Sequence, residues 1–171
     1  MLPTTFTTPR LTLTPLSSED HEFVYALVNS PGWLEFISDG VRKSAEDIAP
    51  YIEKIIANPE CNYWVIRLQN TSTPIGIITF MKRAYLEYFD LGFALLPEFA
   101  GAGYAFEAAS HVLHALAGTR DYDVIMATTI PNNTSSQRLL EKLGFTYIAE
   151  MVRDDERLMI YDIDMDTMSV N

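Results

Sequence analysis

Apolar positions recur along the chain in two periods, and these periods predict its secondary structure. Alternation with polar residues, or a short apolar run rich in β-branched side chains, is typical of strands, whereas repeats every three to four residues are typical of helices. The predicted strands cover about 10–14, 63–68, 75–81, 85–96, 124–129, 145–151 and 157–165. The predicted helices cover about 18–29, 44–58, a long segment from about 104, and 134–143.

Start and stop signals support the helix bounds. Ser44, with Asp47 three residues later, forms a capping pattern at the second helix. Gly144 stands where a left-handed residue commonly ends a helix. The long helix is expected to face the core along one stripe, since five apolar residues recur at helical spacing: Ala105, Ala109, Val112, Leu113 and Leu116.

The order of these elements predicts a single mixed α/β (α+β) domain over residues 1–171. Strands follow one another directly in the middle of the chain, which favours antiparallel pairing, and one strand–helix–strand unit requires a parallel pair. We therefore expect a central, mostly antiparallel sheet flanked by helices. At 171 residues the chain is long enough to bury a substantial core.

Composition narrows the class of protein. A hydrophobic fraction of 48% and a charged fraction of 20% are ordinary for globular proteins. Cys61 is the only cysteine, which excludes an intrachain disulfide or a cysteine-based metal site and fits a cytoplasmic location. No apolar run approaches the roughly 18 residues of a membrane span, and the first residues lack a signal-peptide pattern. We therefore expect no membrane partner.

The formal net charge of −11 bears on the partner. Nucleic acid is an unfavourable partner, because its phosphates would be repelled by such a chain. The charge is consistent with a cationic substrate such as an amine, although solubility alone is the commoner explanation of an acidic composition.

Two glycines separated by one residue, Gly101 and Gly103, mark the most informative turn. An apolar, strand-like run over 91–96 precedes them and the long helix follows. Glycine permits a tight turn and a close approach of the backbone to a ligand. The unpaired N–H groups and the positive dipole end of the following helix favour an anion. The sequence therefore predicts a phosphate-binding site built from main chain.

Two common phosphate motifs do not fit this turn. The dinucleotide fingerprint needs a third glycine where the chain has Phe106, and the acids Asp121 and Asp123 precede the next strand instead of ending it. A nucleoside triphosphate loop needs a Gly-Lys-Ser/Thr ending, which the chain lacks. Both interpretations are disfavoured.

The segment from Leu91 to Ala108 resembles the acyl-CoA-binding segment of the GNAT N-acetyltransferase superfamily. A second segment, Pro131 to Phe145, is similar to the asparagine-containing loop, helix and Leu-Gly-Phe ending of that superfamily. The Pro-Glu-aromatic-x-Gly-x-Gly-Tyr-Ala form and the opening Arg-Leu-x-Leu-x-Pro-Leu resemble its RimJ/RimL-like branch, which acetylates α-amines of ribosomal proteins and various small amines. The resemblance implies a GNAT-like fold whose sheet is splayed at the acyl-CoA site.

The resemblance also implies acetyl-CoA as co-substrate and assigns residues that bind it. Backbone groups of Phe93 and Leu95 would pair with the pantetheine arm, and the Phe93 N–H near the acetyl carbonyl would stabilise an oxyanion. Asn133 matches an asparagine that contacts the same arm, although its position suits a helix cap equally well. The implied main-chain donors to the pyrophosphate are Gly101, Ala102, Gly103, Tyr104, Ala105 and Phe106.

The chain departs from the superfamily pattern in two ways. Ala100 and Ala102 stand where many members carry Arg or Lys, so cationic help with the phosphates must come from elsewhere or be absent. Leu140 stands where a tyrosine general acid is frequent, so that proton donor is missing. Ser136 matches a serine of the RimJ/RimL-like branch and would hydrogen-bond the departing thiolate, although an ordinary polar helix residue fits its position at least as well.

A general base is needed, because an amine must lose a proton before or during its attack. Asp90 and Glu87 lie on the predicted strand that leads to the acetyl site, and Asp90 stands where the branch often has an acid. A solvent-facing strand carboxylate is the alternative for Asp90. His111 and His114 share a helix, but no carboxylate completes a ligand set with them, so no metal is expected.

The aromatic and acidic stretch between the first two predicted helices lies where the superfamily places its acceptor-binding wall. Its candidate residues are Trp33, Glu35 and Phe36, with Asp39 close by. Such a wall suits an amine attached to an apolar or peptide group. A hydrophobic cover over the core is the alternative.

Together the resemblances predict an N-acetyltransferase that moves an acetyl group from acetyl-CoA to a primary amine by direct attack. The acceptor would be a small-molecule amine or a peptide or protein N-terminus. A non-catalytic module that binds acyl-CoA or a partner on the same fold is the alternative, since the tyrosine and the turn cations are missing. The sequence leaves open the identity of the amine and the choice between monomer and homodimer.

Overall fold

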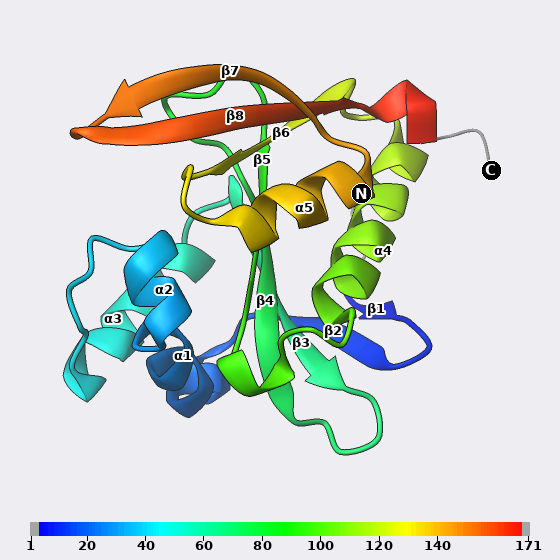
Figure 1. Ribbon diagram of the computed structural model, residues 1–171. Helices are drawn as coiled ribbons and strands as arrows, with labels where there is room; N and C mark the ends of the chain where they lie inside the picture. Colours follow the sequence, from blue (N-terminus) through cyan, green and yellow to red (C-terminus); the bar gives the residue numbers. More distant parts are fainter. Residues whose placement is uncertain (1–3, 169–171) are drawn as a thin grey trace.

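A computed structural model describes residues 4–168, in which eight strands form one sheet (Figure 1). The strand order is β1-β2-β3-β4-β5-β6-β8-β7, and within the described residues every neighbouring pair is antiparallel except β5–β6. The strands are β1 (Phe6–Thr7), β2 (Leu11–Pro15), β3 (Cys61–Leu68), β4 (Pro74–Met81), β5 (Asp90–Leu95), β6 (Val124–Thr129), β7 (Thr146–Arg153) and β8 (Glu156–Asp164). The expected mixed α/β fold with a mostly antiparallel sheet is confirmed.

Helices cover both faces of the sheet (Figure 1). The α-helices are α1 (His21–Val28), α2 (Pro31–Phe36), α3 (Ala45–Ile56), α4 (Tyr104–Thr119) and α5 (Thr134–Leu143), and the short 3₁₀ helices are η1 (Ser18–Asp20), η2 (Pro97–Phe99) and η3 (Met165–Met168). The central strand β4 is buried on both faces of the sheet, and its successive side chains point to opposite faces. Its Ile77 packs with the cluster of α1–α3, and its Ile78 packs with the cluster of α4 and α5.

Local signals fix the helix ends as the sequence predicts. The Ser44 N–H and hydroxyl donate to the Asp47 Oδ2 at 2.9 and 2.8 Å, so the capping pattern at α3 is confirmed. Gly144 ends α5 in the left-handed region with φ of +100°, where glycine has no Cβ to clash. The α4 stripe is buried at Ala109, Val112, Leu113 and Leu116, whereas Ala105 in the first turn is half-buried.

The structure differs from the predicted elements in three places. The strand expected over 85–96 begins only at Asp90, because the chain from 82 to 89 folds into a connection closed by the Lys82 ammonium, which donates to the carbonyls of Leu86 and Glu87. The stretch expected as a loop over 30–40 contains α2, whose Pro31 occupies the first helical position that proline favours. The short strand β1 was not expected either.

Within residues 4–168, no helix combines the length and apolar character that a membrane span requires.

Gly76 on β4 permits the close approach of β5. A Cβ at residue 76 would collide with the Ala94 carbonyl oxygen and lie 2.5 Å from the Leu95 Cδ2. We expect Gly76→Ala to lower the free energy of unfolding by about 1–3 kcal/mol, the usual cost of overpacking. Gly118→Ala on α4 is the matched control, because nothing lies within 4 Å of its added Cβ. The control should leave stability unchanged or raise it by up to about 1 kcal/mol, since alanine favours helix.

Urea denaturation of the two glycine variants measures both changes. Equal effects of Gly76→Ala and Gly118→Ala would contradict a specific steric limit at Gly76.

Candidate active site

The sheet opens between β5 and β6, where one residue pair, Asp90 with Met126, makes up the ladder. The Met126 N–H donates to the Phe89 carbonyl at 2.8 Å, and the strands diverge beyond this point. Backbone groups of successive strand residues point to opposite edges, so those of Phe93 and Leu95 face the same side as Phe89, towards the opening. The N–H of the next residue, Leu96, points to the opposite edge and donates to the Ile75 carbonyl of β4 at 2.8 Å. Phe93 and Leu95 thus present an unpaired strand edge to the gap.

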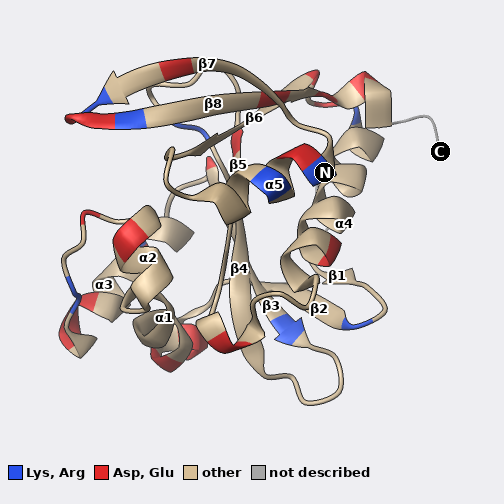
Figure 2. Ribbon diagram, in the orientation of Figure 1, with Lys and Arg blue, Asp and Glu red and all other residues tan. Residues whose placement is uncertain are grey.

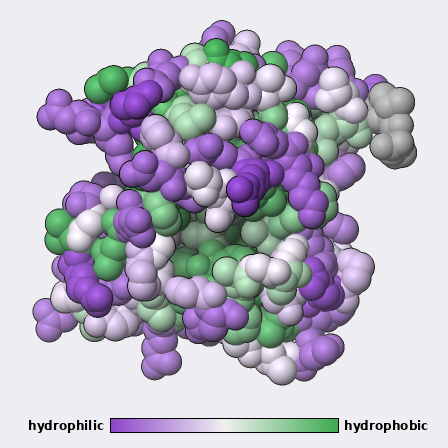
Figure 3. Space-filling view, viewed as in Figure 1, coloured by the Kyte–Doolittle hydropathy of each residue, from purple (hydrophilic) through white to green (hydrophobic). Residues whose placement is uncertain are grey.

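A cavity of about 530 Å³ lies at this opening. Its walls come from α2, α3, the strands β3–β6, the start of α5 and the β7–β8 hairpin. Figure 3 shows the hollow with an apolar floor over the central strands. Elements α2, α3, β3 and β4 contribute aromatic and apolar lining residues: Trp33, Phe36, Ile37, Tyr51, Tyr63 and Ile77. Its size and mixed lining are those of a small-molecule site.

The buried carboxyl of Asp90 lies at the apex of the opening and lines the cavity. Asp90 is 2% exposed, and its Oδ2 accepts a hydrogen bond from the Arg83 Nε at 2.7 Å. Among the described residues, Oδ1 accepts no hydrogen bond of normal geometry. Burial raises the pKa of this carboxyl above its ordinary value, against the opposite effects of Arg83 and the Thr128 backbone N–H. A solvent-facing position for Asp90 is therefore wrong.

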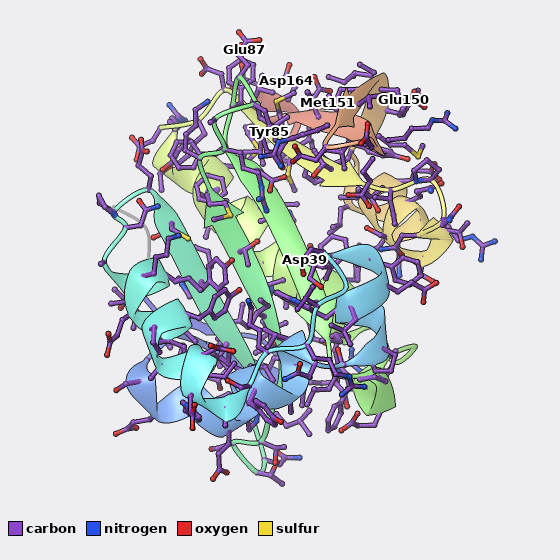
Figure 4. The ribbon with its side chains drawn as sticks, turned by 90° about the vertical axis from the view of Figure 1, so that its left-hand side faces the viewer. Asp39, Tyr85, Glu87, Glu150, Met151 and Asp164 are labelled. Carbon is purple, nitrogen blue, oxygen red and sulfur yellow. The ribbon has the colours of Figure 1, made fainter. Side chains whose placement is uncertain are left out.

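Glu87, the other candidate base, is exposed in the connection between β4 and β5. Figure 4 shows it at the outer end of that connection, apart from Asp39 in front of the central strands. Glu87 does not line the cavity, whereas Asp39 does. Of the two candidate bases, Asp90 thus lines the cavity and Glu87 does not.

The glycine turn stands at the end of the β5 edge, before α4. Gly101 and Gly103 both have φ of +81°, a region that L side chains rarely adopt. The first intrahelical bond runs from the Glu107 N–H to the Gly103 carbonyl at 3.0 Å, and no side chain caps α4, whereas Asn133 caps α5. The N–H groups of the first turn of α4 are therefore free to bind an anion.

Arg10 supplies a cation beside the turn. Its Nη1 donates to the Ala102 carbonyl at 2.9 Å, its Nε donates to the Glu107 Oε2 at 2.6 Å, and its guanidinium lies 4.4 Å from the ring centroid of Tyr104. Burial opposes the charge on Glu107, but hydrogen bonds from Thr8 and Arg10 hold the pKa of Glu107 below its ordinary value. The charges of Arg10 and Glu107 therefore neutralise each other beside the turn.

A second cation, Lys142, approaches from α5. Its Nζ lies 4.1 Å from the ring centroid of Phe106 in the first turn of α4. Figure 2 shows basic positions on α5, which carries this lysine and Arg138. Arg10 and Lys142 are thus cations that neighbouring elements bring close to the turn, in which Ala100 and Ala102 carry no charge.

Comparison with known proteins gives the family. Residues 10–146 match the family model described as acetyltransferase (GNAT) domain. The chain belongs to the GNAT acetyltransferase family. An uncharacterized N-acetyltransferase of Bacillus subtilis (strain 168), YnaD, is 28% identical to it over 138 residues, which are 81% of this chain and 80% of that protein.

Solved structures show the same GNAT fold. An acetyltransferase of the GNAT family from Bacillus anthracis is similar with a TM-score of 0.82 at 23% identity, over 95% of this chain and 99% of that chain. The spermidine N-acetyltransferase from Vibrio cholerae in complex with CoA and spermine is similar with a TM-score of 0.80 at 17% identity, over 95% and 99% of the two chains. At these identities the likeness concerns the fold.

Asn133 and Ser136 line the cavity of this GNAT domain at the start of α5. The Asn133 Oδ1 accepts from the Ser136 N–H at 3.2 Å, so Asn133 does cap the helix. Leu140, one turn further along α5, is buried and also lines the cavity, where the superfamily often has its tyrosine. Contact of Asn133 or Ser136 with a co-substrate stays a prediction.

The expected acceptor wall lies only in part at the cavity. Trp33 and Phe36, three residues apart on α2, share one side of the helix and line the cavity. Glu35 is exposed and is not among the lining residues, because it falls on a different side of the same helix. Of the candidate cofactor contacts in the turn and on β5, Phe93 lines the cavity, whereas Leu95 and residues 101–106 do not.

Several cavity residues carry no local sequence signal. Arg83 lies in the connection between β4 and β5, outside both predicted strands (75–81 and 85–96), and Tyr51 and Tyr63 come from α3 and β3. Burial raises the pKa of both tyrosines, whose hydroxyls interact, so both stay protonated at neutral pH. Gly92 keeps the floor open beside Thr79, since a Cβ there would lie 2.5 Å from the Thr79 Oγ1.

The buried Asp90 makes the stability of the GNAT domain depend on pH. Its folded-state pKa is raised, so its contribution to the free energy of unfolding is full below about pH 4 and is lost as pH rises through the raised pKa. We expect the stability of the wild type relative to Asp90→Asn to fall as pH rises above about 4 in urea titrations, because the folded-state pKa lies above the ordinary value. A difference that is constant or grows over this range would contradict a raised pKa.

Proposed function

We propose that this GNAT domain transfers the acetyl group of acetyl-CoA to a primary amine. The observation that carries the proposal is one continuous path: the glycine turn, the unpaired β5 edge and the free Oδ1 of Asp90 follow one another along the opening of the sheet. Family membership supports it, and so does the shared fold with a spermidine N-acetyltransferase whose structure holds CoA and spermine.

The described residues fit acetyl-CoA as the first substrate. Main-chain donors of the turn, from Gly101 to Phe106, suit its pyrophosphate, with Arg10 and Lys142 nearby. The free edge at Phe93 and Leu95 suits the amide groups of an extended pantetheine arm, which would pair with it as an added strand does. The fit uses backbone groups that otherwise have no partner.

The chemistry we propose is direct attack. The amine nitrogen forms a bond to the thioester carbonyl carbon, the C–S bond breaks, and CoA leaves as thiolate or thiol. Asp90 Oδ1 takes the proton that the amine loses, because it is a buried acceptor with a raised pKa beside the opening. The Phe93 N–H stabilises the negative charge on the carbonyl oxygen, and Ser136 donates to the departing sulfur. Much of the acceleration comes from holding the two substrates together.

Within the family we place the chain in the RimJ/RimL-like branch, on the form of its glycine turn and of its opening segment at Arg10. The acceptor is then a small-molecule amine or a protein N-terminus, and the enzyme acts as a monomer or homodimer.

The first test is binding of acetyl-CoA. Millimolar acetyl-CoA should raise the melting temperature of the wild type, since a ligand that binds only the folded state stabilises it. Gly103→Val should abolish the rise, because φ is +81° at this residue and a side chain is strained there. Gly118→Ala, on the same helix, is the control that should keep it. A rise retained in Gly103→Val would show that the turn does not bind the co-substrate.

The second test is the role of Asp90. With an amine that is acetylated, Asp90→Asn should lower kcat about 10²- to 10⁴-fold and remove a low-pH limb from the rate profile, as loss of a general base does. Release of free CoA measures the rate. An unchanged rate across pH would remove Asp90 as the base.

Leu140 in the place of the frequent tyrosine favours one other candidate, a non-catalytic acyl-CoA-binding module. Binding of acetyl-CoA without CoA release on any of a broad set of amines and peptides would support that candidate over the enzyme.

A further inference from the structure

Arg83 and Asp90 form a polar pair at the cavity in which both partners keep unused hydrogen-bonding capacity. The Arg83 side chain is 37% exposed and lines the cavity from the β4–β5 connection. Within residues 4–168, the only hydrogen bond of its guanidinium runs from Nε to the Asp90 Oδ2 at 2.7 Å, which leaves the donors of both Nη groups. Asp90 in turn keeps Oδ1 as a free acceptor.

The rest of the cavity is of mixed charge. Lys43 and Arg153 line it together with the acids Asp39, Asp154 and Glu156. Three of the chain's 12 basic residues thus lie around this one site, although the chain carries a net charge of −11. A purely cationic acceptor would be better served by a site lined with acids alone, so the net charge of the chain does not describe its cavity.

Two of these peripheral cations are already engaged. Arg153 lies 3.4 Å from the Asp154 carboxylate and 4.4 Å from the ring centroid of Tyr85, and Lys43 lies 5.5 Å from the ring centroid of Tyr51. Arg83, beside the candidate base, is the cation with free donors next to the reacting centre. A planar guanidinium with two free Nη groups matches the geometry of a carboxylate.

We propose that the acceptor is an amine that carries a carboxylate next to its amino group, as a free amino acid does. This inference rests on the proposed function, because it names the acceptor of the same site. The amino group binds the Asp90 carboxyl and the carboxylate binds the Nη donors of Arg83. The two protein groups are hydrogen-bonded neighbours, so a ligand that complements both must hold its own two charged groups close together.

The apolar side of the cavity then takes the side chain of the acceptor. Trp33 and Phe36 line it from α2 and Ile77 from β4, whereas the charged residues Arg153, Asp154 and Glu156 come from the β7–β8 hairpin. An aromatic or aliphatic amino acid fits this division of the cavity into a polar apex and an apolar wall.

The experiment compares each amino acid with the amine that lacks its carboxylate. L-phenylalanine with phenethylamine, and L-leucine with 3-methylbutylamine, are offered with acetyl-CoA, and release of free CoA gives kcat/KM. We expect the amino acid to be preferred at least tenfold in one or both pairs, the contribution of a charge-assisted hydrogen bond.

Variants of Arg83 assign that preference. Arg83→Gln should lower the ratio of kcat/KM within a pair at least tenfold, mostly through KM, and Arg83→Lys should lower it less, because lysine keeps the charge and loses the fork. The ratio cancels any general loss of activity. Arg157→Gln is the control, since Arg157 also pairs with a carboxylate, through two hydrogen bonds to Glu150, and does not line the cavity. It should leave the ratio unchanged.

The outcomes separate this inference from the proposed function. Acetylation of the amines without preference for their carboxylated partners, or an unchanged ratio in Arg83→Gln, overturns the inference and leaves the acetyltransferase in place. If Arg83→Gln does not fold, the ratio in Arg83→Lys decides in the same way. No CoA release with these four compounds, nor with spermine or an alanine-terminated peptide, overturns both.

Discussion

The pairing of β5 with β6 stops after one residue pair, Asp90 with Met126, and the site depends on where it stops. Strands β1 to β5 and strands β6 to β8 are each joined by antiparallel ladders over most of their length. The crossover through α4 requires β5 and β6 to run parallel. A parallel ladder cut short at its first pair leaves a strand edge inside the molecule instead of at its rim. An internal free edge must find a partner, and an extended ligand is a suitable one.

At the same position, the buried carboxyl of Asp90 is costly to ionise. A carboxyl that is 2% exposed is expensive to ionise, and Arg83 together with the Thr128 N–H offsets only part of that cost. One bond from Arg83 leaves Oδ1 of Asp90 without a partner. An arrangement optimised for stability alone would satisfy both oxygens or remove the charge. Unsatisfied buried groups of this kind cluster at functional sites, which supports the role that we propose for Asp90.

Those parts of the structure with local signals could be predicted from the sequence. Strand β6 and helix α5 have the predicted bounds, since a β-branched run marks the first and Asn133 and Gly144 mark the ends of the second. The glycine turn adopts the left-handed conformations that its two glycines imply. Arg83 could not be found in this way. Its distance to Asp90 depends on how the connection after β4 folds, and the apolar pattern there is equally typical of a strand.

The contact of Arg10 with the glycine turn could not be predicted from the sequence either. It reaches the carbonyl of Ala102, 92 positions away in sequence, so no pattern near the turn could reveal it. Its charge is not simply added to the proposed phosphate site, because Glu107 accepts the Nε hydrogen bond and would otherwise leave a bare carboxylate in the first turn of α4. Arg10 therefore neutralises Glu107 and donates a hydrogen bond to the Ala102 carbonyl. The attraction for an anion then comes from the main chain and from Lys142, so the geometry of the two glycines matters more than the number of basic residues.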